Sequence, residues 1–421
     1  MFRKIVLPNG VRVVSERMDA LDTVSLGFWF DVGSANEPKD VNGYTHFIEH
    51  MLFKGTKKYS AYDIVKVIEG VGGNFNAFTS RQFTAFYVSI PSAHLDRALD
   101  ILIDIMESST FDAAEIEKEK KVIIEEIRMA DDSPEEIVSQ QFFTRFYAGS
   151  AMAYPIAGSI PNVRRITRSR LMDYFKTMFR AKSLVVSVAG RFDQRYLLKR
   201  LSAMRITPGK EEGGTALPPP RYDVRVTVKK DLRQVYFCLV HEAYSAGDER
   251  NYPLTVIGNI LGGGSSSRLF QSLRERNALC YNIYTYSSSY RQTGTFEVHA
   301  ATGITTYTKA LSLIRDEMER VRAKDISEAE VAEAKEMYKG ALAFNKMSAD
   351  FIMNKNARHE YYYGRHFTFA DMYKKISLVD MKRVNDVIDG VFGDGRYFLS
   401  AVGPAGTDAA SKSAGKQFSG R

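Results

Sequence analysis

The sequence predicts an α+β protein made of two similar domains, and three observations lead to this prediction. Segments with strand-like alternation and segments with helical spacing are mixed along the chain, without the regular strand–helix alternation of a Rossmann fold. A stretch rich in proline and glycine, residues 207–220, divides the 421 residues near their middle, and the 44% of apolar residues suffices for two cores. The two halves also resemble each other. We therefore expect a first domain over residues 1–206, a hinge linker at 207–220 and a second domain over 221–421.

The first part of the chain begins with strands and continues with helices. The Asn9-Gly10 pair predicts a tight turn followed by an alternating strand, and residues 24–32 repeat the strand pattern. Residues 73–90 carry aromatic and β-branched side chains with a period of two, which predicts a further strand or hairpin. Four segments have helical spacing instead: the one that starts at Gly43, and residues 61–69, 92–108 and 112–130.

The two halves align at two places, which indicates a duplication. Residues 43–55 overlay residues 251–263, and residues 111–120 overlay residues 326–335. At five positions a polar side chain of the first half meets an apolar or small residue of the second: His46, Glu49, His50, Glu119 and Glu126 meet Leu254, Ile257, Gly258, Ala334 and Ala341. We therefore expect the first domain to carry the chemistry and the second to be a degenerate repeat.

The sharpest chemical signal is the segment His46-Phe-Ile-Glu-His50. At about 100° per residue in a helix, His46 and His50 lie about 40° apart and Glu49 lies about 60° to the other side of His46. Two imidazoles one turn apart can share a zinc ion, and the neighbouring glutamate can take a proton from its bound water. The order is that of the inverted zinc motif H-x-x-E-H. The alternative is a surface helix, or a satisfied pair of core histidines, without metal.

A zinc peptidase needs a third protein ligand, and the predicted helix over residues 112–130 is rich in glutamate. Relative to the apolar stripe through Ile123, Glu119 and Glu126 lie about 40° and 60° away, whereas Glu125 lies about 160° away and points to water. So many glutamates usually mean a solvated acidic face. Because Glu119 and Glu126 flank the buried stripe, they are the candidates.

The sequence resembles the pitrilysin-type zinc peptidases, a family that includes the mitochondrial processing peptidases and insulin-degrading enzyme. The resemblance is clearest in residues 46–56 and 122–129 and spans nearly the whole chain, with its duplicated halves and central linker. In that family the third zinc ligand is a glutamate 76 residues after the second histidine, and a supporting glutamate precedes it by seven. Counted from His50, these positions are Glu126 and Glu119.

The resemblance implies a zinc-dependent endopeptidase with one zinc ion per chain. His46, His50 and Glu126 would hold the metal, Glu49 would activate the zinc-bound water, and Glu119 would orient the ligands. The two domains would form a clamshell around a peptide chamber, which admits peptides and unfolded segments and excludes folded proteins.

The resemblance also assigns residues to the substrate. Arg274 and Tyr281 match an arginine and a tyrosine that reach the substrate backbone and the developing oxyanion, although alone they would equally suit a surface cation and a half-buried phenol. Cys280 stands where relatives usually carry glycine or alanine. One segment resembles the strand to which such enzymes add their substrate, with an ordinary sheet strand as the alternative: Asn74, Phe75, Asn76, Ala77 and Phe78.

Composition excludes several other classes. The net charge of +8 comes from dispersed lysines and arginines, so we expect no nucleic-acid partner. No window approaches 18 uninterrupted apolar residues, so we expect no membrane partner, and two cysteines without a targeting segment favour the cytoplasm. Relatives of this length commonly pair, so we expect a homodimer, with a heterodimer with an inactive relative as the alternative. A presequence-type processing protease and a non-catalytic peptide-binding subunit remain alternative functions.

Overall fold

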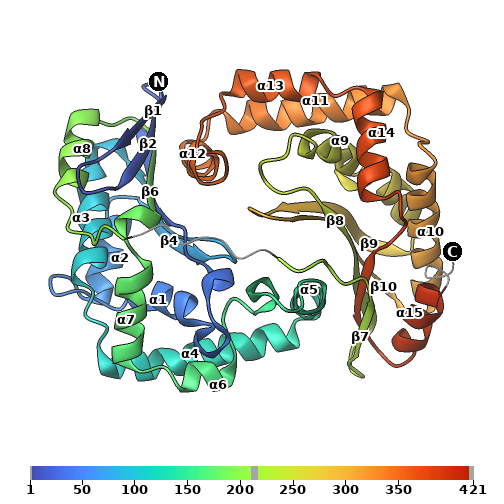
Figure 1. Ribbon diagram of the computed structural model, residues 1–421, viewed down its shortest axis with the longest axis horizontal. Helices are drawn as coiled ribbons and strands as arrows, with labels where there is room; N and C mark the ends of the chain where they lie inside the picture. The colour runs from blue at the N-terminus through green and yellow to red at the C-terminus, as the bar shows by residue number, and fades with distance from the viewer. Residues whose placement is uncertain (1, 210–216, 417–421) are drawn as a thin grey trace. The chain divides into compact units, whose positions relative to one another are not determined.

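The computed structural model describes residues 2–209 and 217–416, which form two compact units (Figure 1). Of these residues, unit 1 comprises 2–128, 154–209 and 344–366, and unit 2 comprises 129–153, 217–343 and 367–416. Each unit has its own sheet and its own hydrophobic core. Part of the predicted hinge linker, residues 210–216, lies outside the described residues.

Unit 1 contains a six-stranded sheet in the order β1-β2-β6-β3-β5-β4. Its strands are β1 (Phe2–Val6), β2 (Arg12–Arg17), β3 (Thr23–Phe30), β4 (Asn74–Thr79), β5 (Thr84–Pro91) and β6 (Leu184–Gly190). β2 and β6 are parallel, and the other neighbouring pairs are antiparallel. Of the strand or hairpin predicted over residues 73–90, the structure has the hairpin, formed by β4 and β5, and β4 forms one edge of the described sheet.

Unit 2 contains a five-stranded sheet in the order β7-β11-β8-β10-β9. Its strands are β7 (Val224–Val228), β8 (Gln234–Ala243), β9 (Cys280–Ser289), β10 (Gly294–Gly303) and β11 (Phe398–Gly403). This order repeats β2-β6-β3-β5-β4 strand for strand, and the first pair is again the parallel one. The topology therefore confirms the predicted α+β class with two similar, mostly antiparallel sheets.

Helices flank both sheets. The first half of the chain supplies α1 (Tyr44–Leu52), α2 (Ala61–Glu69), α3 (Leu95–Ser108), α4 (Ala113–Asp132), α5 (Pro134–Phe146), α6 (Ile160–Arg164), α7 (Arg168–Met178) and α8 (Gln194–Ser202). The second half supplies α9 (Asn251–Gly262), α10 (Ile304–Arg322), α11 (Glu328–Asn345), α12 (Ala349–Tyr363), α13 (Phe369–Ser377), α14 (Met381–Val391) and α15 (Thr407–Lys416). The helices predicted at 43, 61–69, 92–108 and 112–130 are present as α1 to α4, with shifts of up to three residues at their ends.

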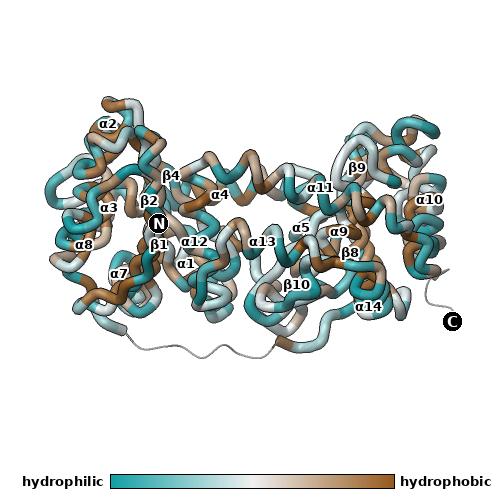
Figure 2. The backbone as a smooth tube through the Cα atoms, turned by 90° about the horizontal axis from the view of Figure 1, so that it is seen from above, coloured by the Kyte–Doolittle hydropathy of each residue, from teal (hydrophilic) through white to brown (hydrophobic). Residues whose placement is uncertain are grey.

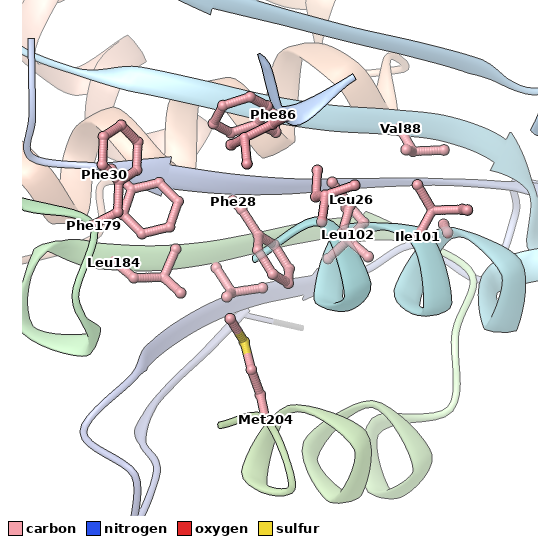
Figure 3. Close-up of a cluster of buried hydrophobic side chains, with 14 of the residues drawn as sticks. Leu26, Phe28, Phe30, Phe86, Val88, Ile101, Leu102, Phe179, Leu184 and Met204 are labelled. Atoms are coloured by element: carbon pink, nitrogen blue, oxygen red, sulfur yellow. The ribbon is translucent and has the colours of Figure 1, made fainter. Parts of the chain in front are cut away.

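The core of unit 1 lies between the sheet and the helices of the first half. Figure 3 shows Leu26 of β3 beside Ile101 and Leu102 of α3, and Phe30 of the same strand beside Phe179, all of them buried. The helices are amphipathic, and Figure 2 shows hydrophobic and hydrophilic residues alternating along α4. Among the described residues, no helix is both long and apolar enough to cross a bilayer.

Each unit contains one helix from the other half of the chain. The predicted domains, 1–206 and 221–421, do not include this exchange of helices. Every residue of β6 is buried, and a strand buried on both faces needs a layer on each side. On one face of the unit 1 sheet this layer is α12, which packs on β2, β3 and β6 although it comes from the second half of the chain. In unit 2, α5 of the first half packs on β8 and β11 in the same way.

Candidate metal centre

A buried carboxylate anchors the helix that carries the two histidines. α1 follows Gly43, which has a φ of +102° and, as a glycine, no side chain to cap the helix. Glu37, which is 2% exposed, accepts hydrogen bonds from the backbone N–H groups of Gly43 (2.7 Å) and Thr45 (2.6 Å) and from Asn42 Nδ2 (2.9 Å). Burial outweighs these bonds and raises the pKa of Glu37 to about 7. The first turn of α1 is thereby fixed to the segment that precedes it.

α1 and α4 bring the three predicted zinc ligands together. The ligand atoms of His46, His50 and Glu126 all lie within 4.8 Å of one another, and His50 Nε2 is 3.6 Å from Glu126 Oε2. The two imidazole rings are 4.6 Å apart, as expected for side chains one helical turn apart. Burial lowers the pKa of His46 to about 3, which keeps that imidazole neutral as metal binding requires.

The donor set fits zinc. Two imidazole nitrogens and one carboxylate oxygen are a usual set for a zinc site that leaves one position open to a reactant. The Nδ1 atom of His50 is hydrogen-bonded to Glu119, so the Nε2 atom of that ring is the one that faces Glu126. The role of these residues as zinc ligands stays a prediction.

Glu119 connects His50 to a lysine. Its Oε1 atom is 2.8 Å from His50 Nδ1, its Oε2 atom is 2.6 Å from Lys54 Nζ, and the residue is 3% exposed. Burial would raise the pKa of Glu119, but the bonds from His50 and Lys54 outweigh it and lower the pKa. For His50, burial would lower the pKa, but the bond to Glu119 and the nearby carboxylates raise it. Such a carboxylate–histidine pair fixes the ring orientation of a metal ligand.

Glu49, the predicted base, projects from α1 next to the two histidines. The hydroxyl of Thr79, at the end of β4, donates a 2.5 Å hydrogen bond to Glu49 Oε2. Burial raises the pKa of Glu49, and the hydrogen bond from Thr79 opposes this effect.

The predicted substrate strand is β4, an edge strand of the described sheet. Asn74 and Asn76 are exposed, whereas the Phe75 ring packs on Phe53 just after α1, with centroids 4.5 Å apart. An exposed strand edge can pair with an extended peptide. On the far side of β4, the Phe78 ring contacts Trp29 at 5.4 Å. Binding of substrate by Asn74, Phe75, Asn76, Ala77 and Phe78 stays a prediction.

Arg274 and Tyr281 lie together in unit 2, whereas the metal ligands are in unit 1. Arg274 Nη1 donates to the backbone oxygen of Tyr281 at 2.7 Å, and its guanidinium lies 4.5 Å from the centre of the Tyr281 ring, which is 78% exposed. The neighbouring Cys280 is a buried free thiol whose pKa is raised by burial. Contact of Arg274 and Tyr281 with substrate stays a prediction.

In unit 2, apolar or small residues stand at the positions that correspond to the candidate site. Leu254 and Ile257 of α9 are buried in the core, as is Ala334 of α11. α9 and α11 approach each other closely enough for Asn259 Nδ2 to donate to the backbone oxygen of Ala334 at 3.3 Å. The second repeat thus has the helices of the site without its chemistry.

Sequence reasoning did not identify Glu37, Lys54 or Thr79. Glu37 lies six residues before Gly43, the N-cap residue of α1, so the two do not have the spacing of a capping box. Thr79 shares a face of β4 with Phe75 by alternation, which is a weak signal that could have placed it towards α1.

Comparison with known proteins identifies the family of the chain. Residues 12–159 match the family model for insulinase (peptidase family M16), and residues 165–338 match the model for the peptidase M16 inactive domain. An uncharacterized zinc protease of Bacillus subtilis, YmxG, is 33% identical over 96% of this chain and 99% of its own. A probable mitochondrial-processing peptidase subunit beta of Arabidopsis thaliana is 28% identical over 96% of this chain and 78% of its own. A solved structure of a protease from Helicobacter pylori has a TM-score of 0.88 at 20% identity, covering 96% of this chain and 99% of that one. The chain therefore belongs to peptidase family M16, the insulinase or pitrilysin-type family.

Proposed function

We propose that this chain is a zinc-dependent endopeptidase with one zinc ion, held by His46, His50 and Glu126. The observation that carries the proposal is the approach of these three ligand atoms to within 4.8 Å of one another beside Glu49. Relatives that are named zinc proteases support zinc as the metal.

The chemistry can be divided among the metal and the side chains. Zinc, when bound, supplies a Lewis acid that polarises the scissile carbonyl and acidifies the attacking water. Glu49 takes the proton of that water on one carboxylate oxygen and passes it to the leaving amine. Glu119, held by Lys54, keeps the His50 ring in its ligand orientation.

We propose peptides or unfolded segments as substrates, bound as an added strand along β4, the edge strand of the described sheet. Backbone pairing accepts many sequences, which suits general peptide degradation. Arg274 and Tyr281 are proposed to bind the substrate backbone and the oxyanion, within the predicted peptide chamber. A homodimer and a cytoplasmic location remain part of the proposal.

A presequence-type processing role is the second candidate, because one relative is named a probable mitochondrial-processing peptidase subunit beta. Digestion of a peptide library, read by mass spectrometry, separates the two roles. Cleavage at many unrelated sites favours degradation, and cleavage confined to one sequence motif favours processing.

The test of the activity compares the wild-type protein with Glu49→Gln and with Glu125→Gln, whose exposed side chain pairs with Arg128. We expect Glu49→Gln to keep its zinc and to lose about 100-fold or more in kcat, because a general base contributes that much. Glu125→Gln should keep both zinc and activity. Full cleavage by Glu49→Gln would refute the role of Glu49 as the base. A wild-type protein without zinc would refute the proposal that the chain is a zinc-dependent endopeptidase.

A further inference from the structure

We propose that Thr79 is a positioning residue, which holds the Glu49 carboxylate in place for proton transfer from the end of the strand that receives the substrate. The inference rests on the proposed function, since it concerns the same base and the same strand. Two kinds of observation carry it: the hydrogen bond itself, and the way in which both of its ends are fixed.

The Thr79 hydroxyl is directed to Glu49. Thr79 Oγ1 is 2.5 Å from Glu49 Oε2, and the carboxylate can only accept, so Thr79 donates. Thr84 lies opposite Thr79 in the β4–β5 register, with the two hydroxyl oxygens 3.5 Å apart. Thr84 has a shorter bond, at 2.8 Å, to the backbone oxygen of Val32. Because a hydroxyl has one proton, the Thr84 proton is taken by Val32, and Thr79 keeps its own for Glu49.

Residues 34–37 form one chain segment that fixes both partners of the hydrogen bond, Thr79 and Glu49. The turn after β4 is bound to this segment by two backbone bonds, Ser34 N to Ser80 O (3.2 Å) and Ala35 N to Arg81 O (2.8 Å). The segment continues directly into Glu37, whose carboxylate holds the first turn of α1. The strand that carries the hydroxyl and the helix that carries the base are therefore fixed to the same few residues.

This arrangement has a chemical consequence. A carboxylate rotates about its terminal bond, and a hydrogen bond to one oxygen stops that rotation and leaves the other oxygen to move the proton. Catalytic groups held within a fraction of an ångström of their working geometry react far faster than mobile ones. A peptide paired with β4 would lie on the same strand that orients the base, so substrate and base would keep a constant relation.

The test uses the full-length zinc-loaded protein with Thr79→Val, Thr79→Ser and Thr84→Val, and Glu49→Gln as the reference. Thr79→Val keeps the shape but removes the hydroxyl, and we expect its kcat to fall by about tenfold or more, with KM within about twofold and zinc content unchanged. Thr79→Ser should recover most of kcat. Thr84→Val leaves the bond from Thr79 to Glu49 intact and should keep kcat within about twofold even though its melting temperature falls.

Three results would overturn the inference: a wild-type kcat in Thr79→Val, a kcat in Thr79→Ser as low as in Thr79→Val, or loss of zinc from Thr79→Val. If Glu49→Gln is inactive while Thr79→Val is fully active, only the positioning role of Thr79 fails. If Glu49→Gln is itself fully active, the proposed role of Glu49 as the base fails, and if the wild-type protein holds no zinc, the proposed function fails, whatever Thr79 does.

Discussion

Ser187 and Ser400 occupy equivalent positions in the two sheets, and each binds a helix that comes from the other half of the chain. The Ser187 hydroxyl on β6 donates to the backbone oxygen of Met353 in α12 at 2.7 Å. The Ser400 hydroxyl on β11 donates to the backbone oxygen of Val138 in α5 at 2.9 Å. Both serines are fully buried. The duplication therefore extends to the exchange of helices, so neither half has a complete pair of layers by itself.

Removal of one serine hydroxyl should loosen one exchanged helix and not the other. We expect Ser187→Ala to cost about 1 kcal/mol of stability, the usual value of one hydrogen bond, and to speed amide hydrogen exchange in α12. Ser400→Ala should do the same to α5. Ser169→Ala, on the exposed surface of α7, serves as the control. Equal acceleration of α5 and α12 in both variants would contradict the assignment of each helix to one unit.

Removal of the Glu126 carboxylate from α4 should show whether Glu126 is a zinc ligand. We expect wild-type protein to hold one zinc ion, and Glu126→Gln to lose more affinity than the about 10- to 100-fold typical of a supporting residue. Glu125→Gln is the matched control, because it changes the adjacent residue, whose side chain is exposed. Atomic absorption after dialysis measures the metal. Retention of zinc by Glu126→Gln would show that the third ligand lies elsewhere.

The supporting carboxylate should have a smaller effect. Glu119→Gln keeps an oxygen near His50 but removes the charge that Lys54 neutralises. We expect zinc affinity to fall about 10- to 100-fold, measured by competition with a chelator. Glu117→Gln, on the exposed side of the same helix, should leave the affinity unchanged. An affinity of Glu119→Gln equal to the wild type would remove Glu119 from the site.

The periodicity of the sequence was enough to predict which site residues lie on the same face of a helix. The spacing of His46, Glu49 and His50 placed them on one face, and the apolar stripe of α4 separated Glu126 from Glu125, as the structure does. Strand patterns also predicted a strand or hairpin over residues 73–90, where β4 and β5 lie.

Such patterns could not predict the contacts between segments that are distant in the sequence. The fully apolar run of β6 indicates a strand covered on both faces, but nothing in it says that the second cover is α12. Similarly, Glu37 and Thr79 act through single hydrogen bonds that depend on how loops fold back, and loops have no period.

The carboxylate that caps α1 should make stability depend on pH. The pKa of Glu37 rises from its usual 4.5 to about 7 in the folded protein because of burial. Between these values the folded state keeps a proton that the unfolded chain releases, so stability is fully present below pH 4.5 and falls as pH rises towards 7. The loss amounts to about 3 kcal/mol over the whole window.

Glu37→Gln carries no charge at any pH and should abolish this component. We expect the free energy of unfolding of the wild type, measured with urea, to fall between pH 5 and pH 8 by about 2 kcal/mol more than that of Glu37→Gln. Glu125→Gln should follow the wild type, because its side chain is exposed. Parallel curves for the wild type and Glu37→Gln would mean that three N–H donors and the helix N-terminus keep Glu37 ionised in spite of its burial.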